Sequence, residues 1–233
     1  MDAWLEWTRG PMFRVAMTFF VLGLLRLAAL TILEIRRAVR RAGDRNIPYR
    51  KLARATLAWL LPARKVGHRP FHSLLTVLFH VSILVVPIFL GMHIMLWARG
   101  TGLSWPAIPN LAADALTLLA LGAAVALAIE RVSIQGPRVL SHFSDYAFPL
   151  LIAVVFGSGF LTMHPAVNPI PFQASMLIHA LAANLLLIFV PFSKLSHVVL
   201  MPLAQLVSEA AWHFPPHAGR DVGLALGKEH EPI

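Results

Sequence analysis

Cysteine is absent from all 233 residues of the chain. The chain therefore forms no disulfide, offers no thiolate to an iron–sulfur cluster and has no C-x-x-C-H motif for covalent haem attachment. Any redox centre that the chain holds must use other ligands. Any iron–sulfur cluster that it works with must belong to another protein.

Charged residues are also scarce, since they make up 13% of the chain while hydrophobic residues make up 58%. A soluble domain usually carries about 25% charged residues. A helix that crosses the hydrocarbon needs roughly 20 apolar residues, so a chain of this length can supply several spans and little else. The composition predicts an integral membrane protein.

Acidic residues are outnumbered, with 11 Asp and Glu against 20 Lys and Arg and a net charge of +9. Eleven of the 20 basic residues lie between Arg36 and Arg69, in one loop between two apolar stretches. Such clustering is typical of a cytoplasmic loop of a membrane protein. We therefore expect contact with membrane lipid and no nucleic-acid partner.

Five apolar stretches are long enough, or nearly so, to cross a membrane. They should be helices, because unpaired backbone groups are not tolerated in lipid. The sequence predicts an all-α membrane protein, with a five-helix transmembrane bundle in residues 1–205 and a polar C-terminal cytoplasmic tail in residues 206–233. The stretches are 11–34, 71–97, 110–129, 146–163 and 174–193.

The distribution of basic residues predicts the orientation of the bundle. The loops 35–70 and 130–145 and the segment that begins at Lys194 carry more basic residues than the opposite side. By the positive-inside rule, the N-terminus lies outside and the C-terminus in the cytoplasm. Within the basic loop, residues 49–61 place Leu52 and Thr56 on one face and predict a short helix at the membrane surface.

Histidines inside the predicted spans are the strongest candidates for function, because an ionisable group in lipid is costly. His80 and His93 lie in the second stretch, and His179 and His197 bracket the fifth. At about 1.5 Å per residue in antiparallel helices, His93 and His179 lie at a similar outer depth. His80 and His197 both lie nearer the cytoplasm. The spacing predicts two bis-histidine iron sites, which suits low-spin electron transfer.

The rotation between the two histidines of one span agrees with this arrangement better in the fifth span than in the second. The interval from His179 to His197 is about 1800°, or five whole turns, so both rings face the same neighbour on a continuous helix. The interval from His80 to His93 leaves the rings roughly 140° apart, and Pro87 between them can kink or unwind the helix. The alternatives are histidines that hydrogen-bond within the bundle, bind another metal or relay protons.

Short sequences around these histidines resemble a known family. Residues 78–84 (LFHVSIL) and 191–197 (PFSKLSH) resemble the di-haem cytochrome b gamma subunit of respiratory nitrate reductase. Residues 87–97 (PIFLGMHIMLW) are more similar to the cytochrome b subunits of sulfite-reduction-associated and heterodisulfide-reductase-like complexes. The resemblance covers most of residues 11–205. His80, His179 and His197 match haem ligands directly, and His93 matches through the second branch.

The resemblance implies a function. The chain would hold two haem b groups and transfer electrons between the quinone pool and a cytoplasmic iron–sulfur subunit of a larger complex. It would be the electron-transfer subunit of a quinone-linked oxidoreductase and a multi-pass protein of a bacterial or archaeal cytoplasmic membrane. The chief rival is a transporter or channel whose buried histidines bind a metal or relay protons.

Four further residues are candidates for supporting roles. Arg26 and Lys194 could pair with haem propionates, although snorkelling and the positive-inside rule explain them equally well. Arg99 and His164 lie near the predicted outer surface, where a quinone headgroup could bind. Ordinary loop polarity is the alternative for both.

Overall fold

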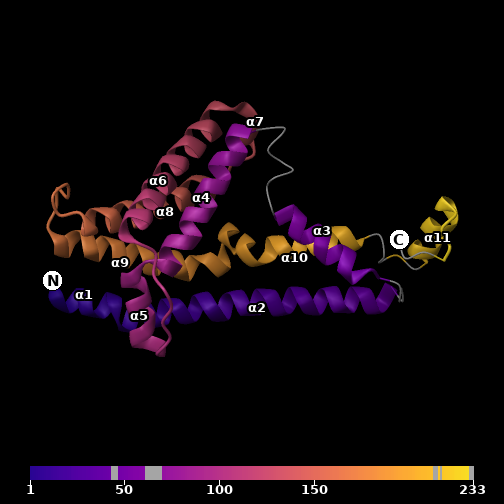
Figure 1. The fold of residues 1–233 in the computed structure, drawn as a ribbon, viewed down its shortest axis with the longest axis horizontal. Helices are drawn as coiled ribbons and strands as arrows, with labels where there is room; N and C mark the ends of the chain where they lie inside the picture. Colours follow the sequence, from indigo (N-terminus) through magenta and orange to yellow (C-terminus); the bar gives the residue numbers. More distant parts are fainter. Residues whose placement is uncertain (43–46, 61–69, 212–214, 216, 231–233) are drawn as a thin grey trace. The chain divides into compact units, whose positions relative to one another are not determined.

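The computed structural model describes residues 1–42, 47–60, 70–211, 215 and 217–230. Helices dominate these ranges, and no strand occurs within them (Figure 1). Among the residues described, five helices are long and apolar enough to cross a membrane, as the composition predicts. The chain divides into two compact units, residues 1–19 with 65–189 and residues 20–64 with 190–233.

The first unit is built on four long helices in an up-and-down arrangement. These are α4 (Pro70–Phe89), α6 (Asn110–Ser133), α8 (Ser144–Met163) and α9 (Phe172–Phe189). Each packs on the next, α4 on α6, α6 on α8 and α8 on α9. Small residues let helix backbones approach closely in lipid. Such residues make up the buried face of α6, namely Ala113, Thr117, Ala120, Ala123 and Ala124.

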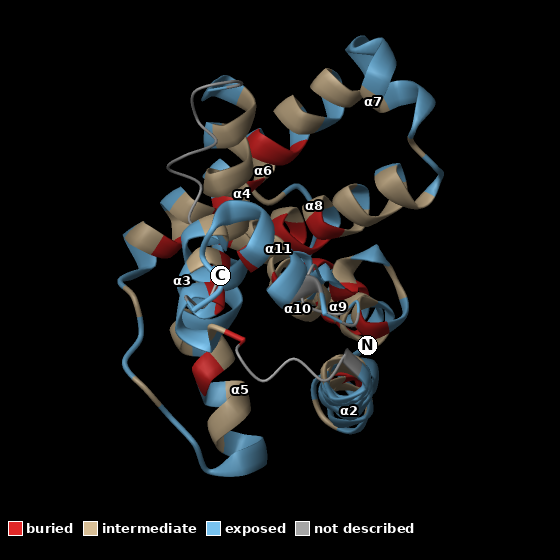
Figure 2. Cartoon of the chain, turned by 90° about the vertical axis from the view of Figure 1, so that its right-hand side faces the viewer, coloured by how far each residue is buried: buried red, intermediate tan, exposed pale blue. Residues whose placement is uncertain are grey.

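The burial pattern suits a lipid solvent. Most buried residues lie in patches along the helices, whereas α2 (Pro11–Ala42) is largely exposed (Figure 2). Many of the exposed side chains are large and apolar. In a soluble protein such a surface would aggregate, but in a bilayer it contacts acyl chains.

The second predicted span, 71–97, is two helices in the structure. Helix α4 ends at Phe89, Leu90 is extended (φ −70°, ψ 128°), and α5 (Gly91–Thr101) begins in a changed direction (Figure 1). Pro87 lacks a backbone donor and weakens the last turn of α4. The carbonyl of Ile88 accepts a hydrogen bond from Trp105 Nε1 (2.8 Å) and that of Phe89 from the Ile108 amide (3.0 Å). The break therefore leaves neither carbonyl unsatisfied.

The N-terminal helix begins earlier than the predicted span 11–34. Helix α1 (Asp2–Arg9) precedes α2 and packs on α9, and the candidate span runs over Asp2–Arg41. Asn184 Nδ2 donates to the carbonyl of Thr8 (2.9 Å), and both residues are buried. This carbonyl is one of the last-turn groups of α1 that has no helical partner. The charged residues of α1 lower the mean hydropathy of this segment, so the sequence did not predict that it continues the first span.

The second unit contains most of α2 together with α3 (Tyr49–Leu60), α10 (His197–Ala210) and α11 (Ala218–Leu226). The predicted helix 49–61 is confirmed as α3, and its face with Leu52 and Thr56 is buried. Helix α10 packs on α3, and Ile47, Leu52 and Ala210 form a small apolar cluster. Helix α10 runs five residues past the predicted domain boundary at residue 205.

The continuous helix assumed between His179 and His197 is absent. Helix α9 ends at Phe189, and two 3₁₀ turns, η2 (Val190–Phe192) and η3 (Lys194–Ser196), lead into α10. Ser193 between them is extended, and its Oγ accepts a hydrogen bond from the Leu195 amide (3.2 Å). The premise of five uninterrupted turns was therefore wrong. Pro191 in η2 and the capping Ser193 interrupt the helix between the two histidines.

Candidate functional site

The structure brings two of the predicted histidines together. His93 lies in the first turn of α5 and His179 in the second turn of α9. Their ring centroids are 6.1 Å apart, and their planes are parallel to within 2°. Both residues belong to the first unit. The break after α4 starts α5 at Gly91, two residues before His93.

His179 is fixed by contacts with α8. Its Nδ1 lies 2.9 Å from the carbonyl of Val155. A carbonyl only accepts, so Nδ1 carries the proton and Nε2 carries the lone pair. The ring lies against Gly159, where a Cβ atom would come within 2.9 Å of Cε1 and 3.0 Å of Nδ1. Backbone fixation of one ring nitrogen is the usual arrangement of a metal-ligating histidine.

His93 presents an unpaired polar atom. Its Nδ1 is buried and has no hydrogen-bond partner within the described part of the chain. A buried imidazole nitrogen without a partner is costly unless a further group completes the site.

The centroid separation of the two rings is compatible with two histidines that would hold one metal. A bond from a metal to an imidazole nitrogen is about 2 Å long, so two axial rings on one metal have centroids roughly 6 Å apart. No group of three or more His, Cys, Asp or Glu residues that could hold a metal occurs among the described residues. Two histidines alone suit a metal whose other ligands come from a macrocycle, as in haem.

The other predicted ligands are placed separately. His80 lies in α4, and its Nδ1 donates to the carbonyl of Thr76 (2.7 Å). His197 is exposed at the start of α10, and its Nδ1 donates to the carbonyl of Lys194 (2.8 Å). In both, Nε2 is therefore the nitrogen with the lone pair. His80 and His197 belong to different units, and their pairing stays a prediction.

The predicted propionate partners lie in the second unit. Arg26 is exposed on α2, and Lys194 is exposed in η3. Arg99 is exposed in the last turn of α5 in the first unit. Exposed positions of this kind agree with lipid-headgroup contact as well as with a role toward a cofactor. The roles of all three residues stay predictions.

His164 has a partner that the sequence interpretation missed. It follows α8 directly, its Nδ1 donates to the carbonyl of Phe160 (2.8 Å), and its ring stacks on Phe160. Its Nε2 lies 3.4 Å from Asp114 Oδ2 in the second turn of α6. The signal was present in the sequence, because a carboxylate within a predicted span is as costly as a histidine.

The opposite end of the bundle has polar contacts of its own. His72 Nδ1 lies 2.6 Å from Glu130 Oε2 and connects α4 to α6. Arg131 donates to Ser141 Oγ (3.1 Å) and lies 3.9 Å from the carboxylate of Asp145 on α8. These contacts join the start of α4, the end of α6 and the start of α8.

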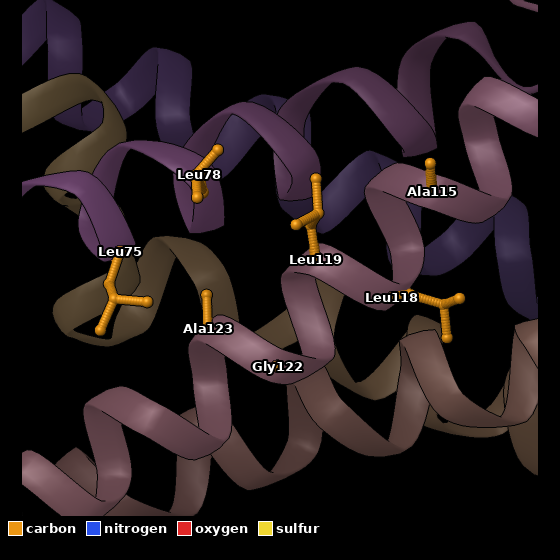
Figure 3. Close-up of a pocket in the computed structure, with 7 residues that line it drawn as sticks. All are labelled: Leu75, Leu78, Ala115, Leu118, Leu119, Gly122 and Ala123. Atoms are coloured by element: carbon orange, nitrogen blue, oxygen red, sulfur yellow. The ribbon is translucent and has the colours of Figure 1, made fainter.

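An apolar groove of about 460 Å³ runs between α4 and α6. Two of its lining residues come from α4 and five from α6, and none has a polar side chain (Figure 3). His80 follows Leu78 by two residues, which places it about 200° around α4 from that lining residue. The groove therefore has no ligand for a metal and suits only an apolar chain. Its lining residues are Leu75, Leu78, Ala115, Leu118, Leu119, Gly122 and Ala123.

Comparison with known proteins gives little about function. No protein-family model matches the chain, and no solved structure matches it. A curated relative from Nitratidesulfovibrio vulgaris (strain Hildenborough) is 34% identical over 149 residues, which are 63% of this chain. The chain covers 64% of that relative's length. The relative is called only "Protein", a name that indicates no activity.

Proposed function

We propose that the chain is a membrane cytochrome b subunit that transfers electrons between the quinone pool and a cytoplasmic iron–sulfur partner through two bis-histidine b haems. The observation that supports this most is the pair of parallel rings of His93 and His179, 6.1 Å apart. The family resemblance of residues 78–84, 87–97 and 191–197 points the same way. Haem, when bound, supplies an iron that accepts and releases one electron.

The chain's own residues would bind and orient that group. Val155 and Gly159 hold the His179 ring so that Nε2 is its ligating nitrogen. The start of α5 brings His93 to the same place. A haem held by two histidine nitrogens would carry electrons, and its iron would have no position left for a substrate. His80 and His197 are the proposed ligands of the second haem.

The proposed setting is a bacterial or archaeal cytoplasmic membrane, with the N-terminus outside and the C-terminus in the cytoplasm. The basic segment 36–69 supports this orientation. Since the chain has no cysteine, the iron–sulfur cluster that exchanges electrons with it must be on a partner subunit. Quinone would exchange electrons near the outer haem and the partner near the inner one.

An asymmetric pair of substitutions tests this electron path. His179→Ala removes a proposed ligand of the outer haem, so quinol should no longer reduce the remaining haem efficiently. His197→Ala should leave quinol-dependent reduction of the outer haem while stopping transfer to the co-purified partner. Rapid-mixing spectroscopy of the complex with quinol measures both steps, and His142→Ala, an exposed histidine outside both pairs, is the control.

Two results would contradict the proposal. If His197→Ala abolishes outer-haem reduction while His179→Ala keeps quinol-to-partner transfer, the quinone site lies at the cytoplasmic end. If the purified wild-type chain is folded, free of haem and conducts ions or metals in vesicles, the rival transporter class is correct.

A further inference from the structure

The contact between His164 and Asp114 differs from the other histidine–carboxylate contact of the bundle. His72 Nδ1 and Glu130 Oε2 are 2.6 Å apart, which is the distance of a short direct hydrogen bond, and the Glu130 side chain is only 17% exposed. His164 and Asp114 are 3.4 Å apart, and about a third of each side chain is exposed. Charge-assisted hydrogen bonds are usually about 2.7–2.9 Å long. The second pair is therefore open enough for a hydroxyl group to approach both members.

The pair lies at the same end of the bundle as the His93–His179 site. Gly159, which contacts the His179 ring, is five residues before His164. On an ideal helix this interval corresponds to about 7.5 Å along the axis and about 140° of rotation, so the two sites lie at the same end of α8 but on different sides of it. Asp114 faces His164 from α6, the helix that packs on α8. A substrate at this pair would lie near the proposed outer haem.

The chemistry of the pair suits proton acceptance. The hydrogen bond from Nδ1 to the Phe160 carbonyl fixes the tautomer of His164, so Nε2 of the neutral ring is a base. The Asp114 carboxylate lies beside Nε2, where it can accept a hydrogen bond from that nitrogen once the proton has moved to it. A base of this kind contributes about 10²–10⁴-fold to a rate.

From this geometry we infer that His164 and Asp114 accept the protons of quinol oxidation. The inference rests on the proposed function. A quinol becomes a quinone by losing two protons and two electrons, so both O–H bonds break. His164 Nε2 would accept the two protons in turn and pass them, through the pair, to water. The two electrons would be taken up one at a time by ferric haem held by His93 and His179.

Substitutions at the pair test the inference in the purified two-haem protein with duroquinol as the probe. Asp114→Asn and His164→Gln should each slow haem reduction at saturating duroquinol about 10²-fold. The duroquinol concentration for half-maximal rate should change little, because the pair acts on the proton and not on the ring. Asp114→Glu keeps a carboxylate and should restore much of the rate.

Controls separate this role from a loss of structure. Dithionite reduction needs no quinol proton and should reach both haems at an unchanged rate in every variant. Glu130→Gln disrupts the contact at the opposite end of α6 and should leave duroquinol reduction unchanged. Redox-difference infrared spectra with duroquinol give a second readout. They should show a carboxyl or imidazole band that Asp114→Asn shifts and Glu130→Gln does not.

The outcomes of this inference and of the proposed function are distinguishable. Wild-type rates with duroquinol in Asp114→Asn and His164→Gln, with two haems retained, would overturn the proton-accepting role alone. A wild-type protein without haem would overturn the proposed function on which the role rests. Equal slowing in Glu130→Gln would also count against the inference, because the effect would then be structural.

Discussion

At the scale of single residues, the proposed outer haem site depends on a glycine, Gly159, which has no side chain to displace the His179 ring. Gly159 leaves room for the His179 ring against α8, and the Val155 carbonyl holds its Nδ1. These two contacts come from positions four residues apart, so they lie on one face of the helix. The orientation of the ring is thus set by the backbone of α8 and not by α9 alone.

Gly159→Ala should displace the ring and remove the outer haem. The new Cβ would lie 2.9 Å from Cε1 of His179, a distance that the ring can relieve only by moving away. Pyridine haemochromogen assay should give one haem per chain in this variant and two in the wild type. Gly157→Ala is the matched control, because a Cβ at that position of α8 meets no atom within 4 Å. Two haems in Gly159→Ala would show that the ring does not need this position.

At the scale of helices, the break between α4 and α5 positions His93. On one continuous helix, His80 and His93 would lie roughly 140° apart. Because Leu90 is extended, α4 ends and α5 begins in a new direction. The ring of His93 on α5 lies parallel to that of His179. Trp105 and Ile108 satisfy the carbonyls that the break exposes.

Pro87→Ala should therefore weaken the outer site. The restored amide can donate to the helix, which favours continuation through Leu90 and rotates His93 away from His179. We expect loss of outer haem with retention of the inner one, measured by reduced-minus-oxidised spectra. Pro149→Ala in α8, which also replaces a proline inside a helix, should keep both haems. An unchanged spectrum in Pro87→Ala would mean that other residues hold the break.

The number and approximate positions of the membrane helices could be predicted from the sequence, because long apolar runs leave the backbone few alternatives in lipid. Pro87 also indicated an interruption of the second run, although not that a new helix would begin at Gly91. The position of that break depends on a tertiary hydrogen bond from Trp105, whereas the break at Ser193 follows Pro191 and a local serine cap. The proximity of His93 and His179 was predictable from depth, whereas Asp114 lies in an otherwise apolar predicted span, and the sequence alone does not show that it faces His164.

At the scale of the whole molecule, the orientation in the membrane decides which of the two proposed haems would face the proposed partner. The positive-inside rule predicts that residues 36–69 are cytoplasmic and residues 100–110 are outside. Reporter fusions after residues 45 and 104 measure this directly, with cytoplasmic activity expected for the first and periplasmic activity for the second. A cytoplasmic signal from the fusion after residue 104 would exchange the inner and outer haems and move the partner to the other side.

The haem content of the purified, folded chain tests the central claim most directly. The account predicts two haem b groups per chain by pyridine extraction, each with the absorption spectrum of low-spin, bis-histidine iron. His93→Ala and His179→Ala should each lower the count to one, since either change removes a ligand of the same iron. A folded wild-type protein that contains no haem would contradict the account.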